Sequence, residues 1–381
     1  MERKIPSFIK IYESLISIPT ISSHNKLLDQ TNKNFIDLLS NYLSDLNFSI
    51  KINQVPDTNK FNMLASIGSG DGGLLLSGHS DTVDFDENTW TKDPFTLTEI
   101  DNKFYGLGTV DMKGFFAFLL EVLSSINSKK IKKPIYILST ANEETDMSGA
   151  KYFMTSSIIR PDCIIIGEPT SLELINAHKG HISYSIQVVG STGHSSNPDD
   201  GVNSIEIMHN IIENLISLKK YLKQKYENKK FSVPYPTMNL SSIHGGDAIN
   251  RICSLCTLNI EIRPIPGLTL TQIEILIQEK LQSIIQKWSN RIILKKLYSA
   301  VPAYQCCKNK NVTKIVEKLC SLNSKTANYC TEAPFFKKIA PTLILGPGSI
   351  RQAHQPDEYL DSSFIQPTIN VFNKIIHKFC C

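Results

Sequence analysis

Metal-binding residue types follow several short apolar runs in the chain. A histidine ends the run GLLLSGH, two adjacent glutamates follow PIYILSTAN, and a further glutamate follows CIIIG. A second histidine comes a few residues after TLILGPG, and an aspartate precedes the apolar segment that begins at Met112. Imidazole and carboxylate groups together are ligands of Zn²⁺ and related ions. These residues are His79, Asp111, Glu143, Glu144, Glu168 and His354.

The apolar runs are typical of strands that alternate with helix-length segments up to about residue 178, which predicts an α/β domain with a largely parallel sheet. The segment Met112–Ile126 is apolar nearly all round, which predicts a buried helix. Ligands bind outside the carboxyl ends of the strands in such sheets, so side chains far apart in sequence converge there.

A set of two imidazoles and three carboxylates suits two Zn²⁺ ions with one bridging carboxylate and room for a water. The alternative at each single position is an acidic residue that caps a helix or lies in a solvated loop. Five suitable residues at the strand ends of one domain favour the metal site.

Asp81 lies two residues after His79, which in an extended segment places both side chains on one side. A carboxylate there can accept the free ring N–H of a metal-bound histidine and orient the ring. The alternative is an Asx-type turn around Ser80.

The adjacent glutamates Glu143 and Glu144 follow a predicted strand, and we expect them to point in different directions on an irregular turn. One can bind metal while the other takes a proton from metal-bound water, a step that contributes roughly 10²- to 10⁴-fold in rate. The residues alone do not decide which glutamate has which role.

From about residue 180 the pattern changes to strand, helix, strand, strand, helix and strand, the order of a split ferredoxin-like α+β unit. The α/β pattern resumes after about residue 292. We therefore predict a catalytic metal-binding domain of residues 1–178 and 292–381, with an inserted domain of residues 179–291. The second predicted helix of the inserted domain carries an apolar stripe of Ile277, Leu281, Ile284 and Trp288.

Composition limits the class of protein. The chain has 381 residues, 41% hydrophobic and 20% charged, as in ordinary globular enzymes. Its 40 basic and 36 acidic residues leave a net charge of +4 that is spread along the chain, so nothing in the composition supports nucleic-acid binding. No apolar run approaches the roughly 20 residues of a spanning helix, and the charged start MERKIPSFIKIYES is unlike a signal peptide. We expect a cytoplasmic protein that does not bind membranes.

The nine cysteines are an odd number at irregular spacings, which favours a reducing compartment. Cys253 and Cys256 form a C-x-x-C pair in the segment Arg251–Arg263, which alternates like a strand. An offset of three places the two thiols on opposite faces of a strand, so buried thiols are favoured over a redox or zinc pair.

Five motifs in their order and spacing resemble the metal-dependent deacylase and aminoacylase peptidase family: GHSDTV, YGLGTVDMKG, ANEET, GEPT and AHQPDEY. The match covers nearly the whole chain. Within this family, GLG and HQPDEY resemble the branch that deacetylates N2-acetyl-L-ornithine, whereas the succinyl-diaminopimelate desuccinylases usually have GRG and a different histidine segment. Ser80 is a departure, since threonine is commoner there.

The resemblance implies a zinc-peptidase-like catalytic domain that holds two Zn²⁺ or Co²⁺ ions per subunit. It implies that Glu143 is the general base and that Asp81 orients a histidine ligand. It also implies a cis peptide after Asp111 and an association with glutathione as a cofactor. In the implied ligand set, His79 and Glu168 bind one ion, Glu144 and His354 bind the other, and Asp111 bridges both.

The inserted domain resembles the family's lid and dimerisation domain, which implies a homodimer. His194, in the loop GSTGHSS, corresponds to a histidine that polarises the scissile carbonyl, although an ordinary loop histidine is the alternative. Asn250 and Arg251 open a predicted strand, and an arginine there suits the α-carboxylate of a substrate through a bidentate contact. The alternative for these two residues is a salt bridge at the strand edge.

The resemblance implies hydrolysis of N2-acetyl-L-ornithine to L-ornithine and acetate, in arginine biosynthesis. Two other hypotheses stay open. One is a different hydrolase of the family, such as the desuccinylase or a dipeptidase, and the other is a catalytically inactive binding scaffold. The chain retains all seven residues of the predicted metal site and its proton chemistry, which speaks against the scaffold. They are His79, Asp81, Asp111, Glu143, Glu144, Glu168 and His354.

Overall fold

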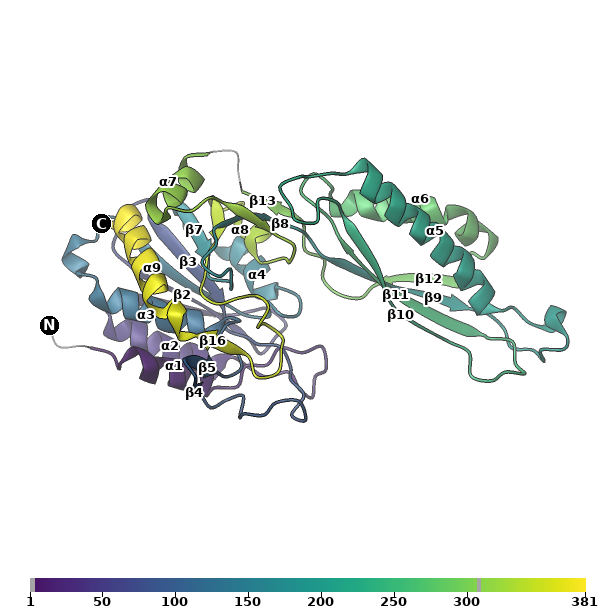
Figure 1. Ribbon diagram of the computed structural model, residues 1–381, viewed down its shortest axis with the longest axis horizontal. Coiled ribbons are helices and arrows are strands. Elements are labelled where there is room, and N and C mark those ends of the chain that lie inside the picture. The colour runs from purple at the N-terminus through teal and green to yellow at the C-terminus, as the bar shows by residue number, and fades with distance from the viewer. Residues whose placement is uncertain (1–3, 307–309) are drawn as a thin grey trace. The chain divides into compact units, whose positions relative to one another are not determined.

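The structure, a computed structural model, describes residues 4–306 and 310–381 (Figure 1). The chain divides into two compact units. Of the nine cysteines, Cys307 lies outside the described residues. Unit 1 comprises Met1–Asn176, Cys306–Lys325 and Thr331–Cys381, and unit 2 comprises Ala177–Gln305 and Thr326–Cys330.

Unit 2 extends further along the chain than the inserted domain of residues 179–291 that the sequence predicts. The strand β12 (Ile292–Lys296) pairs with β9 (Ile182–Val189), so its backbone hydrogen bonds belong to the sheet of unit 2. The border at residue 291 therefore lies too early, and the compact unit continues to Gln305.

The centre of the sheet in unit 1 is parallel. Strands β6, β3, β7 and β15 are neighbours in this order and run in the same direction, while β1, β2 and β8 at the two sides are antiparallel to their neighbours. This arrangement confirms the predicted α/β class. The bounds are β1 Ser49–Gln54, β2 Phe61–Ile67, β3 Leu74–His79, β6 Ile135–Thr140, β7 Cys163–Ile166, β8 Ile175–His178 and β15 Thr342–Ile344.

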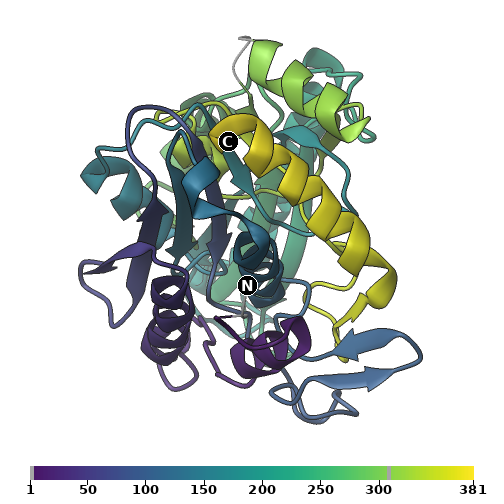
Figure 2. The same ribbon diagram turned by 90° about the vertical axis from the view of Figure 1, so that its left-hand side faces the viewer.

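Helices cover the sheet because its central strands are apolar on both faces. Every residue of β3 and β7 is buried, as parallel strands require. The helix α3 (Lys113–Ser125) packs against β3 and against α9 (Ile365–Cys380), whose course beside the sheet is visible in Figure 2. Since α3 is buried from Lys113 to Leu120 without a break, it confirms the predicted buried helix. Further helices are α1 Phe8–Ile16, α2 Lys33–Asp45, α4 Ser148–Ser156, α7 Lys310–Cys320 and α8 Ala333–Phe336.

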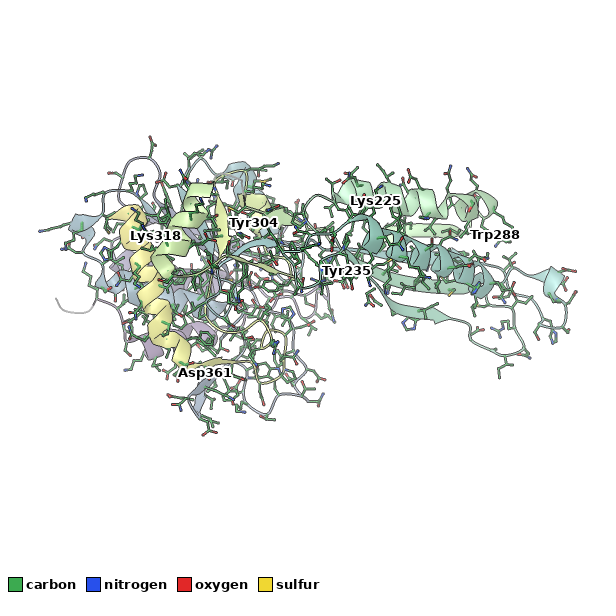
Figure 3. All side chains as sticks on the ribbon, turned by 45° about the horizontal axis from the view of Figure 1, so that its top comes forward. Lys225, Tyr235, Trp288, Tyr304, Lys318 and Asp361 are labelled. Atoms are coloured by element: carbon green, nitrogen blue, oxygen red, sulfur yellow. The ribbon has the colours of Figure 1, made fainter. Side chains whose placement is uncertain are left out.

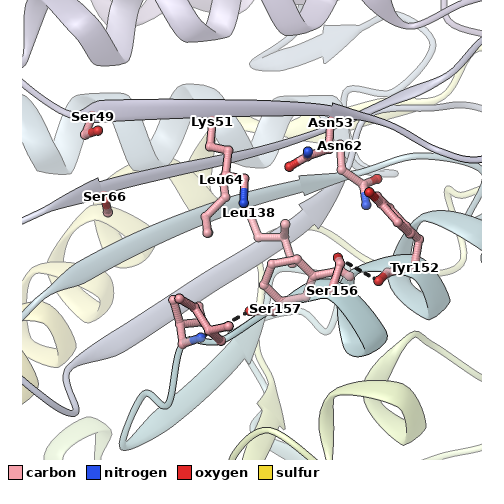
Figure 4. A pocket seen from close by; sticks show the side chains of 13 residues that line it. Ser49, Lys51, Asn53, Asn62, Leu64, Ser66, Leu138, Tyr152, Ser156 and Ser157 are labelled. Atoms are coloured by element: carbon pink, nitrogen blue, oxygen red, sulfur yellow. Dashed lines mark hydrogen bonds between the residues drawn. The ribbon is translucent and has the colours of Figure 1, made fainter.

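A pocket of about 310 Å³ lies between β1, β2 and α4 (Figure 4). Its lining includes Lys51 from β1, Leu64 from β2 and Tyr152 from α4. Asn62 in its wall donates to the carbonyl of Gly149 at 2.8 Å. None of the residues that line this pocket is a predicted site residue.

A small antiparallel sheet in unit 1 has the order β16 (Tyr359–Asp361), β5 (Lys103–Tyr105) and β4 (Thr98–Ile100). The register pairs Tyr359 with Tyr105, so the segment after His354 lies beside the segment that leads to Asp111. The described residues include no helix with both the length and the apolar character needed to cross a bilayer.

Unit 2 has a four-stranded antiparallel sheet in the order β10, β11, β9 and β12, and this confirms the predicted ferredoxin-like order. Alternate residues of β11 are buried against the helices, where the predicted stripe of α6 also packs. Trp288 follows α6 and is labelled in Figure 3. The remaining bounds are α5 Ser204–Lys225, β10 Thr237–Gly245, β11 Leu255–Arg263 and α6 Leu270–Lys287, and the short strands β13 Tyr304–Gln305 and β14 Lys325–Ala327 pair with β8.

The C-x-x-C pair differs in one detail from the prediction. Because β11 begins at Leu255, Cys253 precedes the strand and only Cys256 lies within it. Both residues are buried and neither forms a disulfide, which agrees with the interpretation of Cys253 and Cys256 as buried thiols.

Candidate metal centre

The carboxyl ends of the parallel strands bring the predicted ligands together in unit 1. His79 is the last residue of β3, Glu144 follows β6 by four residues, and Glu168 follows β7 by two. Asp111 lies two residues before α3, and His354 lies in the loop between β15 and β16. Residues from five separate segments therefore meet at one edge of the sheet.

Of three groups of possible ligand atoms among the described residues, two share Asp111. The first group is His79, Asp111 and Glu168, and the second is Asp111, Glu144 and His354; within each group the atoms lie within 4.8 Å of one another. One oxygen of Asp111, Oδ1, is 3.0 Å from Nε2 of His79, and the other, Oδ2, is 3.4 Å from Nε2 of His354. A carboxylate whose two oxygens face different histidines has the geometry of a bridging ligand between two ions.

The adjacent glutamates differ in their contacts. The Glu144 carboxylate lies 3.1 Å from Nε2 of His354 through Oε2. The Glu143 carboxylate has no hydrogen bond to any residue that the structure describes, although it lies in a group with His79 and Glu144. The two glutamates thus differ in their surroundings: Glu144 contacts a candidate ligand histidine, whereas the Glu143 carboxylate makes no such hydrogen bond within the described residues.

The cluster carries an excess of negative charge. Burial and the nearby carboxylates raise the pKa of Glu143 and of Glu168 well above the ordinary value. Burial alone would lower the pKa of His79, but its hydrogen bond to Asp111 and the charge of Glu168 raise it. Hydrogen bonds to Asp111 and Glu144 raise the pKa of His354 to about 11. A divalent cation bound among these groups would favour the ionised carboxylates and the deprotonated imidazole nitrogens, which are the forms that can bind it.

Asp81 contacts His79 through a different group from the one that the sequence predicts. Its carboxylate oxygen Oδ1 is 3.7 Å from Nδ1 of His79, too far for a hydrogen bond, whereas its backbone carbonyl is 2.9 Å from that nitrogen. The carboxylate instead accepts the backbone N–H groups of Glu143 and Glu144, each at 3.2 Å. The structure thus gives the His79 ring a hydrogen bond to the Asp81 carbonyl and not to its carboxylate, which these two donors hold. The orienting role of the carboxylate stays a prediction.

The turn that carries the glutamates rests on a network that the sequence does not reveal. Lys60 is 2% exposed, and its Nζ lies 2.8 Å from Asp29 and 2.9 Å from Oγ of Ser22. Ser22 donates to the side chain of Asn142 at 3.1 Å, and Asn142 directly precedes Glu143 with a positive φ of 59°. The only signal in the sequence is the asparagine itself, which tolerates this conformation.

A further buried acid lies near the cluster. Oε2 of Glu332 accepts a hydrogen bond from Oγ1 of Thr140 at 2.9 Å, while its Oε1 has no hydrogen-bond partner among the described residues. Burial raises the pKa of Glu332 to about 8. The Asp111–Met112 peptide bond is cis, as the resemblance implies.

The three site residues predicted in the inserted domain lie together in unit 2. His194 and Arg251 form an isolated β-bridge, and His194, Asn250 and Arg251 line the same open pocket. Both Asn250 and Arg251 lie in the loop before β11 and do not open the strand. Arg251 makes an ion pair with Asp247 at 2.8 Å, so the local salt bridge weighed as the alternative is present.

Comparison with known proteins identifies the family. The model of peptidase family M20/M25/M40 matches residues 75–378. The chain is 75% identical over 380 residues to an acetylornithine deacetylase of Buchnera aphidicola subsp. Acyrthosiphon pisum (strain Tuc7), and 54% identical over 381 residues to one of Pectobacterium carotovorum subsp. carotovorum (strain PC1), with 100% of each chain covered in both cases.

A solved structure shares the fold. An M20 family metallo-carboxypeptidase from Sulfolobus solfataricus matches with a TM-score of 0.78 and 16% sequence identity, over 98% of this chain and 99% of that one. Since the family model covers most of the chain and the curated relatives cover all of it, the chain belongs to peptidase family M20/M25/M40.

Proposed function

We propose that the protein hydrolyses N2-acetyl-L-ornithine to L-ornithine and acetate as a metal-dependent amidohydrolase, a step of arginine biosynthesis. The observation that carries the proposal is the Asp111-centred cluster, in a chain that is 75% identical over its full length to a relative named acetylornithine deacetylase. The reaction adds water across one amide bond, so it needs a general base, an acidic site for the carbonyl and a donor for the departing amine.

The donor set fits two borderline divalent ions, Zn²⁺ or Co²⁺. His79 and Glu168 would hold one ion, Glu144 and His354 the other, and Asp111 both. When bound, such ions supply Lewis acidity that polarises the carbonyl and acidifies water. The proposal of glutathione as a further cofactor rests on the family resemblance alone.

The chain's own residues carry the proton steps. Glu143 accepts a proton from the attacking water and returns it to the amine nitrogen as the C–N bond breaks. The Asp81 carboxylate holds Glu143 in place by accepting a hydrogen bond from the backbone N–H of Glu143. The imidazole of His194 stabilises the charge that develops on the carbonyl oxygen.

Turnover of the purified, zinc-loaded protein on several substrates tests the proposed activity. We expect acetylornithine to be hydrolysed with a higher kcat/KM than succinyl-diaminopimelate or dipeptides. A higher kcat/KM for succinyl-diaminopimelate or for a dipeptide would instead identify the protein as a desuccinylase or a dipeptidase of the same family. Absence of turnover on all of them, with metal bound, would favour the binding scaffold.

Arg251 is proposed to bind the substrate α-carboxylate, with Asn250 beside it. Arg251→Ala should lower kcat/KM for acetylornithine by roughly 10- to 100-fold, because a hydrogen bond to a charged group contributes ~1.5–3 kcal/mol. The amide of acetylornithine lacks this charge and should lose much less. Asp247→Asn is the matched control, since it removes the ion pair but leaves the arginine. Equal losses on both compounds would remove Arg251 from this role.

We further propose a cytoplasmic homodimer in which His194 of one subunit serves the active site of the other. The basis is the resemblance of the inserted ferredoxin-like unit to the family's dimerisation domain. His194→Ala should lower kcat by ~10²-fold or more, the usual cost of deleting an oxyanion donor.

Mixing two inactive variants tests whether His194 acts across subunits. When His194→Ala and Glu143→Ala proteins exchange subunits, each mixed dimer has one site with both groups intact. Activity should return to a fraction set by the share of mixed dimers. Verified subunit exchange without recovery of activity would contradict the assignment.

A further inference from the structure

Glu358 is a buried carboxylate outside the ligand set, with 1% of its surface exposed. Its Oε1 accepts the backbone N–H of Val110 at 2.7 Å and that of Asp111 at 3.0 Å. Its Oε2 accepts the backbone N–H of Gly108 at 3.1 Å. A single side chain thus binds three backbone amides of the loop that ends at Asp111.

The backbone of the same residue makes a further link. Its carbonyl accepts the N–H of Gly106 at 3.0 Å, and the next residue, Tyr359, begins β16 beside β5. His354 lies only four residues before Glu358. The loop that carries His354 is therefore fastened to the loop that carries Asp111 by the side chain and by the backbone of one residue.

The loop of residues 106–111 is also held on the side away from Glu358. Gly108 has a φ of 85°, and a Cβ there would lie 2.6 Å from Cε of the buried Lys113. The Tyr12 hydroxyl donates to the carbonyl of Thr109 at 2.7 Å. The other side of the loop is packed in this way, and the amide of Asp111 points at the Glu358 carboxylate.

We propose that Glu358 is a positioning residue that holds the Asp111 carboxylate with one oxygen toward His79 and the other toward His354, the orientation in which it would serve both metal ions. This inference rests on the proposed function, because it assumes that Asp111 is a metal ligand. It predicts that the length of the Glu358 side chain matters as well as its charge. Groups that orient metal ligands typically contribute 10- to 100-fold in metal affinity.

Two substitutions separate charge from position. Glu358→Gln keeps the size but removes the charge and turns an NH₂ group toward at least one backbone N–H. Glu358→Asp keeps the charge but withdraws the carboxylate by one methylene. Asp357→Asn is the matched control, because it neutralises the adjacent carboxylate, which bonds to the backbone of Thr91 at 2.9 Å and not to the Asp111 loop.

The measurements are Zn²⁺ affinity by competition with a chelator and the visible absorption spectrum of the Co²⁺-loaded protein. We expect both Glu358 variants to bind Zn²⁺ at least ~10-fold more weakly and to show an altered Co²⁺ spectrum, with the control unchanged. The free energy of unfolding of each metal-free variant, measured in denaturant, shows whether that variant folds. If one of the two Glu358 variants does not fold, the remaining one provides the test.

Three results would overturn the inference. Unchanged affinity and spectrum in both variants would show that Glu358 does not position Asp111. A loss in Glu358→Gln without a loss in Glu358→Asp would assign its effect to charge alone. If the unsubstituted protein binds no metal, the proposed metal site fails and the inference fails with it. If the unsubstituted protein and both Glu358 variants bind metal equally well, only the inference about Glu358 fails and the proposed function stands.

Discussion

Glu143→Ala is expected to bind metal like the unsubstituted protein and to hydrolyse acetylornithine at least ~10²-fold more slowly. Within the described residues its carboxylate has no hydrogen bond, so its loss removes no contact that orders the cluster. Burial and the charge of Glu168 raise its pKa, which makes it a stronger base than an exposed glutamate. Metal analysis and kcat on the same preparation test both halves of this expectation.

The neighbouring substitution should give the opposite phenotype. Glu144→Ala removes a carboxylate that lies 3.1 Å from Nε2 of His354 and belongs to the candidate ligand group with Asp111 and His354. We expect metal binding itself to weaken. Glu173→Ala is a control, since it removes an exposed carboxylate that pairs with Lys325. If the two phenotypes are exchanged, the roles of Glu143 and Glu144 are exchanged as well.

Asp111→Ala is expected to damage both metal sites together. The unsubstituted protein should hold about two equivalents of zinc or cobalt and lose its activity in chelator. Because each oxygen of Asp111 faces a different histidine, a single substitution removes one ligand from both groups.

Metal content after dialysis measures this effect, with Glu168→Ala as the comparison because Glu168 belongs only to the group with His79. That variant should weaken mainly one site. Retention of one ion at full affinity by Asp111→Ala would contradict a bridging role. Absence of any ion from the unsubstituted protein under zinc-replete conditions would contradict the site as a whole.

The sequence by itself determined the elements and the edge at which the chemistry lies. Apolar runs that end in His79, or shortly before Glu144 and Glu168, identify strand ends, and parallel strands place those ends at one edge. The helix after Asp111 and the ferredoxin-like order follow from local periodicity in the same way. These features are predictable because the spacing of apolar residues along a short segment shows which of its faces is buried, and this spacing differs between strands and helices.

Only the tertiary structure decided which atoms meet. The sequence predicts a contact between the Asp81 carboxylate and His79, but the donors that hold this carboxylate are backbone amides of a turn 62 and 63 residues away. The partner of the Asp111 amide, Glu358, is 247 residues distant in the chain. The border of the inserted unit likewise depends on pairing between β12 and β9. Contacts of this kind depend on the path of loops between distant segments, and no local pattern of residue types encodes that path.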